Sequence, residues 1–313
     1  MSPNHKHPTL GVVMALTASL LFGLNASTTK VLIHSGITAG QLVLFRSLAV
    51  TLIAAVVVSI RAPKTFKIEW REAGKFAAYG VLGIGLMQWA YSNAVSTMQV
   101  GPALLIEYTA VVIVPVASLV IFKDAVHRRL WLAVALVLAG LIVVSHPWDS
   151  WLNPIGVLWA ALAAVLLSFN FIMGERLQRT RDSYSTLFFG FAAASLFWLV
   201  VGLATGTAGF SAGGGVNLGG NLAGLTVPVW VLLTWVALAG SFLPMLLTTM
   251  SLRHLSASGV GVASTAETIF AFVFGYLWLS ERIDLAQTVG AVIVITGIVV
   301  AQTARSKTWQ PSK

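Results

Sequence analysis

The chain has 313 residues, of which 57% are hydrophobic and 9% charged, and it carries a formal net charge of +9 without a cysteine. Soluble domains contain about 25% charged residues, so this composition excludes a soluble enzyme and indicates an integral membrane protein. The lack of cysteine excludes disulfides, thiolate metal sites and cysteine nucleophiles.

Long apolar runs follow one another along the chain. A hydrocarbon core about 30 Å thick needs roughly 20 apolar residues per helix. Cutting the sequence where charges and turn residues cluster gives ten candidate spans, at 9–33, 38–60, 73–95, 100–122, 129–146, 154–175, 184–204, 227–252, 257–280 and 284–304. These runs do not alternate apolar and polar residues as membrane strands do. The predicted fold class is therefore all-α integral membrane, with ten transmembrane helices.

The connections between spans set the orientation, because lysine and arginine are retained on the cytoplasmic side of short loops. With the N-terminus inside, sixteen of the nineteen basic residues fall in cytoplasmic segments and only Arg282 falls outside, while Lys30 and Arg46 lie within spans. Both termini are thus predicted to be cytoplasmic, and the net charge needs no nucleic-acid partner. The uncharged, glycine-rich stretch 206–224 predicts a flexible external loop.

The two halves of the chain resemble each other. A shift of 146 residues aligns the first span with the sixth and places Lys30 on Arg176. A shift of 157 residues aligns the fourth and fifth spans with the ninth and tenth and places the loop acid Asp124 on Glu281. Shared polar positions and nearly equal shifts indicate an internal duplication.

Each half holds five spans, an odd number, so the second copy is expected to be inverted in the membrane. We predict two five-helix repeats, residues 9–146 and 154–304. Inverted repeats are typical of secondary transporters, in which two opposed halves alternate around a site near the midplane.

Two carboxylates interrupt the apolar runs, Glu107 in the fourth span and Glu267 in the ninth. A charged residue at mid-span costs roughly 2.5 to 3.5 kcal/mol to insert, so such residues usually face a cavity. The 157-residue shift places Glu107 on Ser264, one helical turn from Glu267, so both carboxylates are expected to face one central cavity. They are candidates for binding a substrate amine or carrying a proton. The alternative is a neutral carboxyl group hydrogen-bonded between helices.

Cations within the spans are candidates for gating or lining a pathway. Lys30 and Arg46 lie toward the outer ends of the first and second spans, where long side chains can also snorkel to the headgroups. Lys30 is the stronger candidate because Arg176, a third candidate, occupies its repeat position. Pro244 in the eighth span is either a hinge or a static kink.

Polar and aromatic residues within the spans are further candidates for substrate binding or proton coupling: Tyr108, Asn25, Trp89, Asn93 and Asn170. Contacts between helices use such residues equally well, so a structural role stays open for each. No nucleotide-binding or metal-binding motif is present, and we expect no cofactor and no metal.

The chain resembles the EamA family of the drug/metabolite transporter superfamily over essentially its full length. The resemblance is carried by Phe22-Gly23-Leu24-Asn25 through Lys30, Arg46 before Ser47-Leu48-Ala49, Ile106-Glu107-Tyr108-Thr109-Ala110, and Ala266-Glu267 leading to Leu279-Ser280-Glu281-Arg282. Two positions depart from the family pattern. Thr268 replaces the proline that usually follows the glutamate of the ninth span, and Val111 replaces the proline that often follows the fourth-span run.

The resemblance implies ten helices, with spans one, three, four, six, eight and nine around a central cavity. It also implies export or exchange of small metabolites, amino acids or amines among them, by a multi-pass protein of the cytoplasmic (plasma) membrane. Two alternatives stay open: a transporter of amphiphilic drugs or lipid-linked substrates, or an integral-membrane enzyme that modifies lipids. The enzyme is disfavoured because both glutamates lie too deep to reach a headgroup. The partners are then a small-molecule substrate, the lipid bilayer and, if transport is coupled, protons; the substrate, the direction and the oligomeric state stay open.

Overall fold

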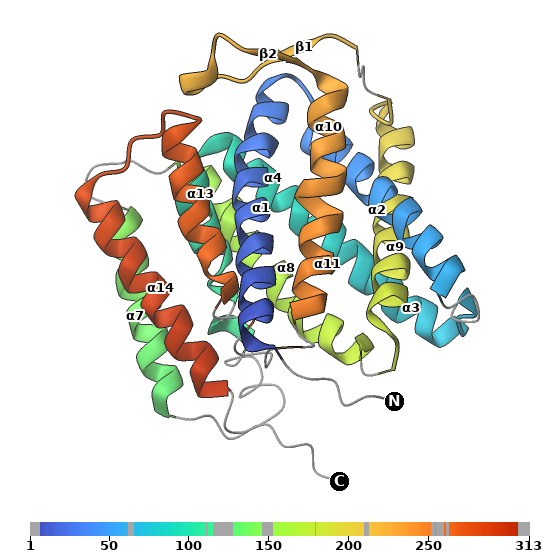
Figure 1. Ribbon diagram of the computed structural model, residues 1–313, viewed down its shortest axis with the longest axis horizontal. Coiled ribbons are helices and arrows are strands. Elements are labelled where there is room, and N and C mark those ends of the chain that lie inside the picture. The colour runs from blue at the N-terminus through green and yellow to red at the C-terminus, as the bar shows by residue number, and fades with distance from the viewer. Residues whose placement is uncertain are drawn as a thin grey trace.

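The computed structural model describes residues 7–61, 66–110, 112–114, 128–145, 153–178, 180–209, 213–251, 254, 260 and 263–305. Helices make up most of this part of the chain and run alongside one another (Figure 1). Their bounds are α1 Pro8–His34, α2 Ala39–Arg61, α3 Trp70–Ala78, α4 Met87–Thr97, α5 Val100–Glu107, α7 Arg128–Ser145, α8 Pro154–Gln178, α9 Ser183–Thr205, α10 Val229–Ala237, α11 Leu243–Ser251, α13 Ala266–Leu277 and α14 Leu285–Arg305.

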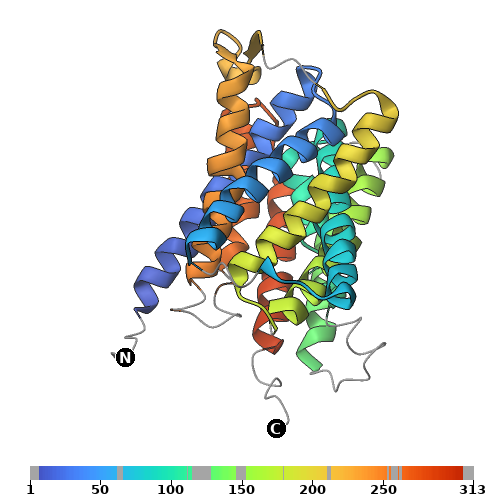
Figure 2. The ribbon, with the colours of Figure 1, turned by 90° about the vertical axis from the view of Figure 1, so that its right-hand side faces the viewer.

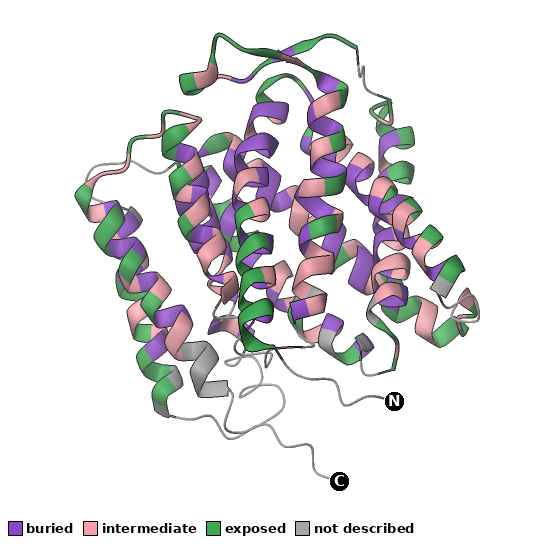
Figure 3. Cartoon of the chain, viewed as in Figure 1, coloured by how far each residue is buried: buried purple, intermediate pink, exposed green. Residues whose placement is uncertain are grey.

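The described helices are those of a multi-pass membrane protein. Five segments are long and apolar enough to cross a bilayer: Pro8–His34, Ala39–Ile60, Pro154–Gly174, Tyr184–Thr205 and Val229–Thr248. Shorter apolar helices accompany them, among them α7 and α14. Many buried residues lie on the helix faces turned toward the middle of the bundle, and many exposed ones lie on the outward faces (Figure 3). The exposed residues include large apolar side chains such as Leu158. Lipid can solvate such outer faces because each helix satisfies its own backbone polar groups.

The bundle has two distinct ends, which Figure 2 shows in a second view. α1 begins and α14 ends at the same end, which we call the terminal end. The opposite end carries a two-stranded antiparallel hairpin of β1, Gly215–Asn217, and β2, Thr226–Pro228. We call it the hairpin end.

The hairpin corrects the prediction of a flexible loop at 206–224. Val216 and Leu218 are buried in one cluster with Val31 of α1 and Leu232 of α10. Two apolar side chains at alternate positions therefore anchor a glycine-rich segment onto the helices. The short 3-10 turn η3, Gly220–Leu222, joins the strands and also contacts the end of α13, since the amide of Asn221 donates to the carbonyl of Trp278 at 2.9 Å.

Two helices contain π-helical segments at related positions. η2, Tyr79–Leu86, joins α3 to α4, and η4, Leu238–Phe242, joins α10 to α11. The 157-residue shift found in the sequence places Gly83 of η2 on Gly240 of η4. π-helical turns are rare and often occur at functional sites. The recurrence of this geometry at one repeat position supports the internal duplication.

The crossing of α7 and α14 gives independent support for the duplication. A Cβ atom added at Gly140 would lie 2.7 Å from Val294, and one added at Gly297 would lie 2.8 Å from Val137. The 157-residue shift places Gly140 on Gly297 and Val137 on Val294. The two helices therefore make the same glycine–valine contact on each other at this crossing. Glycines at such a crossing allow two backbones to approach closely.

At the terminal end an ion pair connects α3 with the segment before α9. Arg181 donates from Nε to Glu72 Oε1 at 2.8 Å and from Nη2 to Glu72 Oε2 at 2.7 Å. The Arg181 guanidinium also lies 5.3 Å from the centre of the Phe189 ring. This bidentate pair ties the two halves of the chain together near the bilayer surface.

The Arg181–Glu72 pair predicts a pH-dependent contribution to stability. The hydrogen bonds from Arg181 lower the pKa of Glu72 below its ordinary value of 4.5. A carboxylate with a depressed pKa contributes stability above its unfolded-state pKa and loses that contribution as the pH falls through its folded-state pKa. Arg181→Gln is therefore expected to reduce the free energy of unfolding at pH 7 by about 0.2–1 kcal/mol, as for other partly exposed pairs.

Thermal unfolding of the purified protein in detergent checks this expectation at several pH values. The difference in melting temperature between the wild type and Arg181→Gln should shrink as the pH falls below 4.5. A difference that stays constant down to the pH at which the protein unfolds would contradict it.

Candidate functional site

The two intramembrane carboxylates lie at the ends of helices from different halves of the chain. Glu107 is the last residue of α5 and is 6% exposed. Glu267 lies in the first turn of α13, where the helix dipole favours an acidic residue. The two carboxylates are close enough for their charges to interact.

Tyr108 connects this pair. Its hydroxyl donates to Glu267 Oε2 at 2.5 Å, while its backbone follows directly after Glu107. In contrast, the Glu107 carboxylate makes no hydrogen bond within the described ranges, so it is available to a proton or a cationic ligand. Of the residues predicted from sequence, the structure brings these three together.

α1 approaches the carboxylates closely because of a glycine. A Cβ atom at Gly23 would lie 2.7 Å from the Cβ of Phe270 and 3.1 Å from the carbonyl oxygen of Glu267. Any larger residue at this position would push α1 away from the first turns of α13. Gly23 therefore lets the polar face of α1 reach the region of the two carboxylates.

Polar side-chain atoms without hydrogen-bond partners gather on the helices around this region. Among the described residues they include Asn25 Oδ1 and Ser27 Oγ of α1, Tyr91 Oη and Ser92 Oγ of α4, Ser241 Oγ of η4 and Thr268 Oγ1 of α13. Buried polar groups are normally paired, and each unpaired one costs about 1–3 kcal/mol. This set of donors and acceptors can bind water or a polar solute.

Asn25 and Asn170 occupy related positions against the π-helical segments. Asn170 of α8 donates from Nδ2 to the carbonyl of Gly83 at 2.8 Å. Asn25 of α1 packs so tightly against Gly240 that a Cβ atom there would overlap its side chain. Each asparagine thus contacts the π-helical segment of the opposite half. Asn170 uses its amide nitrogen in this contact, whereas Asn25 keeps an unpaired oxygen.

The other two predicted residues on α4 lie in a different environment. Trp89 makes ring contacts with Trp159 of α8 and Trp198 of α9, at centroid distances of 4.8 and 5.8 Å. Asn93 donates to the carbonyl of Trp89 at 2.8 Å, within its own helix. These ring contacts and this hydrogen bond do not involve the two carboxylates.

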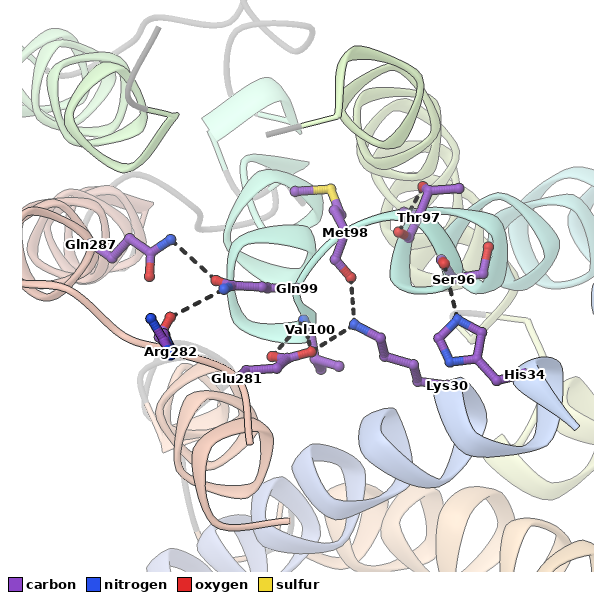
Figure 4. Close-up of polar contacts among 11 residues, drawn as sticks. Lys30, His34, Ser96, Thr97, Met98, Gln99, Val100, Glu281, Arg282 and Gln287 are labelled. Atoms are coloured by element: carbon purple, nitrogen blue, oxygen red, sulfur yellow. Dashed lines mark hydrogen bonds and ion pairs between the residues drawn. The ribbon is translucent and has the colours of Figure 1, made fainter. Parts of the chain in front are cut away.

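Lys30 forms an ion pair with Glu281 at the hairpin end. The sequence alone leaves open that its side chain snorkels to the headgroups. Lys30 Nζ lies 2.7 Å from Glu281 Oε1 and donates to the carbonyl of Met98 at 2.9 Å (Figure 4). Glu281 also accepts from the backbone amide of Val100 at 3.1 Å. Only 15% of the Lys30 side chain and 10% of the Glu281 side chain are exposed. The pair connects α1, the start of α5 and the segment after α13.

Glu281 is positioned by a strained turn. α13 is followed by a turn in which the amides of Leu279 and Glu281 both donate to the carbonyl of Gly275, at 3.1 and 3.0 Å. Ser280 takes the left-handed position of this turn with φ of 58°, where glycine is usual. Its hydroxyl donates to Asn221 Oδ1 at 2.9 Å, so the hairpin loop stabilises the conformation that directs Glu281 toward Lys30.

Additional hydrogen bonds extend this network along the hairpin end. Gln287 of α14 donates from Nε2 to Gln99 Oε1 at 3.1 Å, and Gln99 donates from Nε2 to the carbonyl of Arg282 at 3.1 Å (Figure 4). His34 Nε2 lies 3.2 Å from the carbonyl of Ser96. These contacts join α1, the α4–α5 connection and α14. A shallow cavity of about 430 Å³, lined in part by Lys30 and Glu281, opens beside the network.

Arg46 is buried within the bundle and does not reach the bilayer surface. It is 5% exposed and donates from Nη1 to Gln88 Oε1 at 3.2 Å and from Nη2 to Thr29 Oγ1 at 3.0 Å. Both partners are neutral, and Nε has none.

The last two predicted residues lie elsewhere. Arg176 is exposed near the terminal end of α8. Pro244 is the second residue of α11, which begins directly after η4, and it has no amide hydrogen to donate to the carbonyl of Gly240 in the π-helical segment. In the part of the chain that the structure describes, no group of three or more metal-ligating side chains is found.

Comparisons with known proteins agree with this architecture. A sequence model described as the EamA-like transporter family matches residues 9–146 and 154–303. A solved structure described only as the crystal structure of a protein superposes with a TM-score of 0.65 over 95% of this chain and 98% of its own, at 15% identity. At that identity the similarity shows a shared fold. No curated protein matches the sequence.

Proposed function

The chain belongs to the EamA-like transporter family, and from this membership we propose that it is a secondary exporter of small metabolites such as amino acids or amines. Members of this family are transporters and not enzymes. In the proposed arrangement ten helices form two inverted repeats, residues 9–146 and 154–304, in the plasma membrane. Both termini are cytoplasmic, so the hairpin end faces outward.

The contact between Tyr108 and Glu267 is the observation that carries this proposal. It joins the end of α5 in the first half to the start of α13 in the second half. Movement of one half against the other would change this contact directly, as alternating access requires. Unpaired polar atoms of α1 and α4 lie on the helices beside it.

The two carboxylates suit an exchange of protons for a cationic group. A carboxylate within the membrane is stable when it is protonated or when it pairs with a cation. One carboxylate cannot hold a proton and pair with a substrate ammonium at the same time. Competition at Glu107 and Glu267 would therefore couple the outward movement of substrate to the inward movement of protons.

Transport into proteoliposomes tests this function. The purified protein is reconstituted, and uptake of radiolabelled amino acids and amines is measured with and without an imposed proton gradient. We expect gradient-dependent accumulation of at least one solute. Equilibration without accumulation would indicate a facilitator, and movement of amphiphilic drugs or lipid-linked substrates alone would replace the proposed substrate class.

A further inference from the structure

Arg46 differs in its partners from Lys30 and Arg181, the half-buried lysine and arginine whose ion pairs the structure describes. Lys30 pairs with Glu281, and Arg181 pairs with Glu72. Arg46 is more buried than either, yet across the described ranges it contacts no carboxylate. Its two hydrogen bonds go to the neutral groups of Gln88 and Thr29.

A buried guanidinium with only neutral partners is unfavourable in this environment. Arginine stays protonated in proteins, so it cannot reduce the cost of burial by losing its proton. Charged residues within a membrane bundle usually face its interior or a cavity, pair with one another or with backbone carbonyls, and mark substrate or ion pathways. The guanidinium of Arg46 also keeps a free Nε–H, next to two nitrogens held in place by α1 and α4. Its planar fork matches the geometry of a carboxylate.

Tyr91 relates Arg46 to the proposed substrate site. The Tyr91 hydroxyl is buried, lacks a hydrogen-bond partner within the described structure, and interacts electrostatically with Arg46, Glu107 and Glu267. Tyr91 lies one helical turn after Gln88, the α4 residue that holds Arg46. It also shares a buried cluster with Ile106, next to Glu107, and Ala271, one turn after Glu267. A solute beside Tyr91 would therefore lie near a cation and near two carboxylates.

We propose that Arg46 binds the carboxylate of the transported solute, which makes the solute an amino acid or another organic acid and excludes amines that lack a carboxylate. The inference rests on the proposed transport function and narrows its substrate class. Arg46 supplies the anion site, while Glu107 and Glu267 receive the ammonium group or the proton. Thr29 and Gln88 hold the guanidinium in place.

The competing explanation is a structural one, in which Arg46 only ties α1 to α4 through Thr29 and Gln88. Two substitutions separate these roles. Arg46→Gln removes the charge and retains a hydrogen-bonding side chain, whereas Arg46→Lys retains the charge and loses the fork. Arg181→Gln is the matched control, because it removes an arginine that already has a carboxylate partner.

The test uses an amino acid transported by the wild type, together with its amide, which lacks the carboxylate charge. We expect the amide to compete about tenfold less well than the amino acid, on the scale of a charge-assisted hydrogen bond. Arg46→Gln should raise the KM for the amino acid by about tenfold or more and leave inhibition by the amide unchanged, with Arg46→Lys between the two. Arg181→Gln should keep the wild-type KM.

Other outcomes overturn the inference. Equal competition by acid and amide, or an unchanged KM in Arg46→Gln, would assign Arg46 a structural role. Transport of amines alone would leave the proposed function intact and refute the anion site.

If no solute is transported, the proposed function fails, and thermal unfolding in detergent then decides the role of Arg46. Acetate, glycine or succinate should stabilise the wild type and not Arg46→Gln. Absence of that shift, or an equal shift with chloride, would refute a carboxylate site.

Discussion

Glu267→Gln is expected to reduce proton-driven transport by about a hundredfold while the protein still inserts and folds. Glutamine has the same size and can accept the hydrogen bond from Tyr108, so the contact between α5 and α13 is retained. It can neither take up a proton nor pair with an ammonium, so the exchange at this position stops. A loss of about 2.7 kcal/mol in the transport barrier corresponds to that factor. The measurement is the initial rate of accumulation per inserted protein in proteoliposomes under a proton gradient.

Two further variants define the role of Glu267. Tyr108→Phe removes the donor at 2.5 Å and keeps the carboxylate, so its effect should be smaller. Glu72→Gln changes a glutamate at the terminal end and should leave the rate per inserted protein unchanged.

Exchange of labelled for unlabelled substrate across the membrane, measured without a proton gradient, distinguishes proton carriage by Glu267 from ammonium binding. If Glu267 carries the proton, Glu267→Gln retains exchange and loses accumulation; if it binds the ammonium, both are lost. Glu107→Gln is measured in the same way, and full activity in both glutamine variants would contradict the carboxylate mechanism.

Features that depend on periodicity and charge could be predicted from the sequence. Apolar runs of sufficient length identified the spans that the structure shows as long apolar helices. The 157-residue register brought Glu107 and Glu267 to one region, because helices of one fold place equivalent residues at equivalent depths. The structure adds the hydroxyl of Tyr108 between α5 and α13, a detail that depends on the end of one helix and the start of another.

Features that depend on backbone geometry could not be predicted. The sequence around Gly83 shows no local signal for a π-helical segment, and the carbonyl of Gly83 accepts its hydrogen bond from Asn170, which is distant in sequence. Near Gly240 the one local signal is Pro244, which cannot donate a backbone hydrogen bond. The hairpin at 215–228 was missed for a similar reason. Its glycines indicate flexibility, and only the contacts of Val216 and Leu218 with the helices order it.

Glu281 illustrates how the partner of a predicted site residue can be missed. It lies 251 residues from Lys30, and its direction is fixed by the left-handed backbone of Ser280. The sequence did contain one signal, because the internal shifts place Lys30 on Arg176 and Asp124 on Glu281. Two charged positions preserved together in both halves suggest a pair. Asp124 itself lies outside the described residues.

Breaking the Lys30–Glu281 pair is expected to open the hairpin end of the pathway. Without Lys30, the carboxylate of Glu281 keeps, among the described residues, only the hydrogen bond from the amide of Val100, and α1 loses its charged contact with the segment after α13. Removing one partner of a fully buried ion pair costs about 3–5 kcal/mol. Both side chains are partly exposed here, so we expect a smaller loss of stability for the closed state, about 1.4–2.7 kcal/mol. Lys30→Gln should therefore shift the population toward the open state by about ten- to a hundredfold.

The chain has no cysteine, so an introduced thiol reports this shift without background. Ser27 is fully buried and lies one turn below Lys30 on α1, which makes Ser27→Cys a nearly isosteric reporter. A membrane-impermeant maleimide added from outside should label it about tenfold faster in the Lys30→Gln background, the lower end of the expected population shift.

Lys30→Glu combined with Glu281→Lys should restore slow labelling by re-forming the pair, whereas either reversal alone should not. Arg181→Gln, which breaks the pair at the opposite end, controls for general loosening. Equal labelling rates with and without Lys30 would show that the ion pair does not hold this end closed.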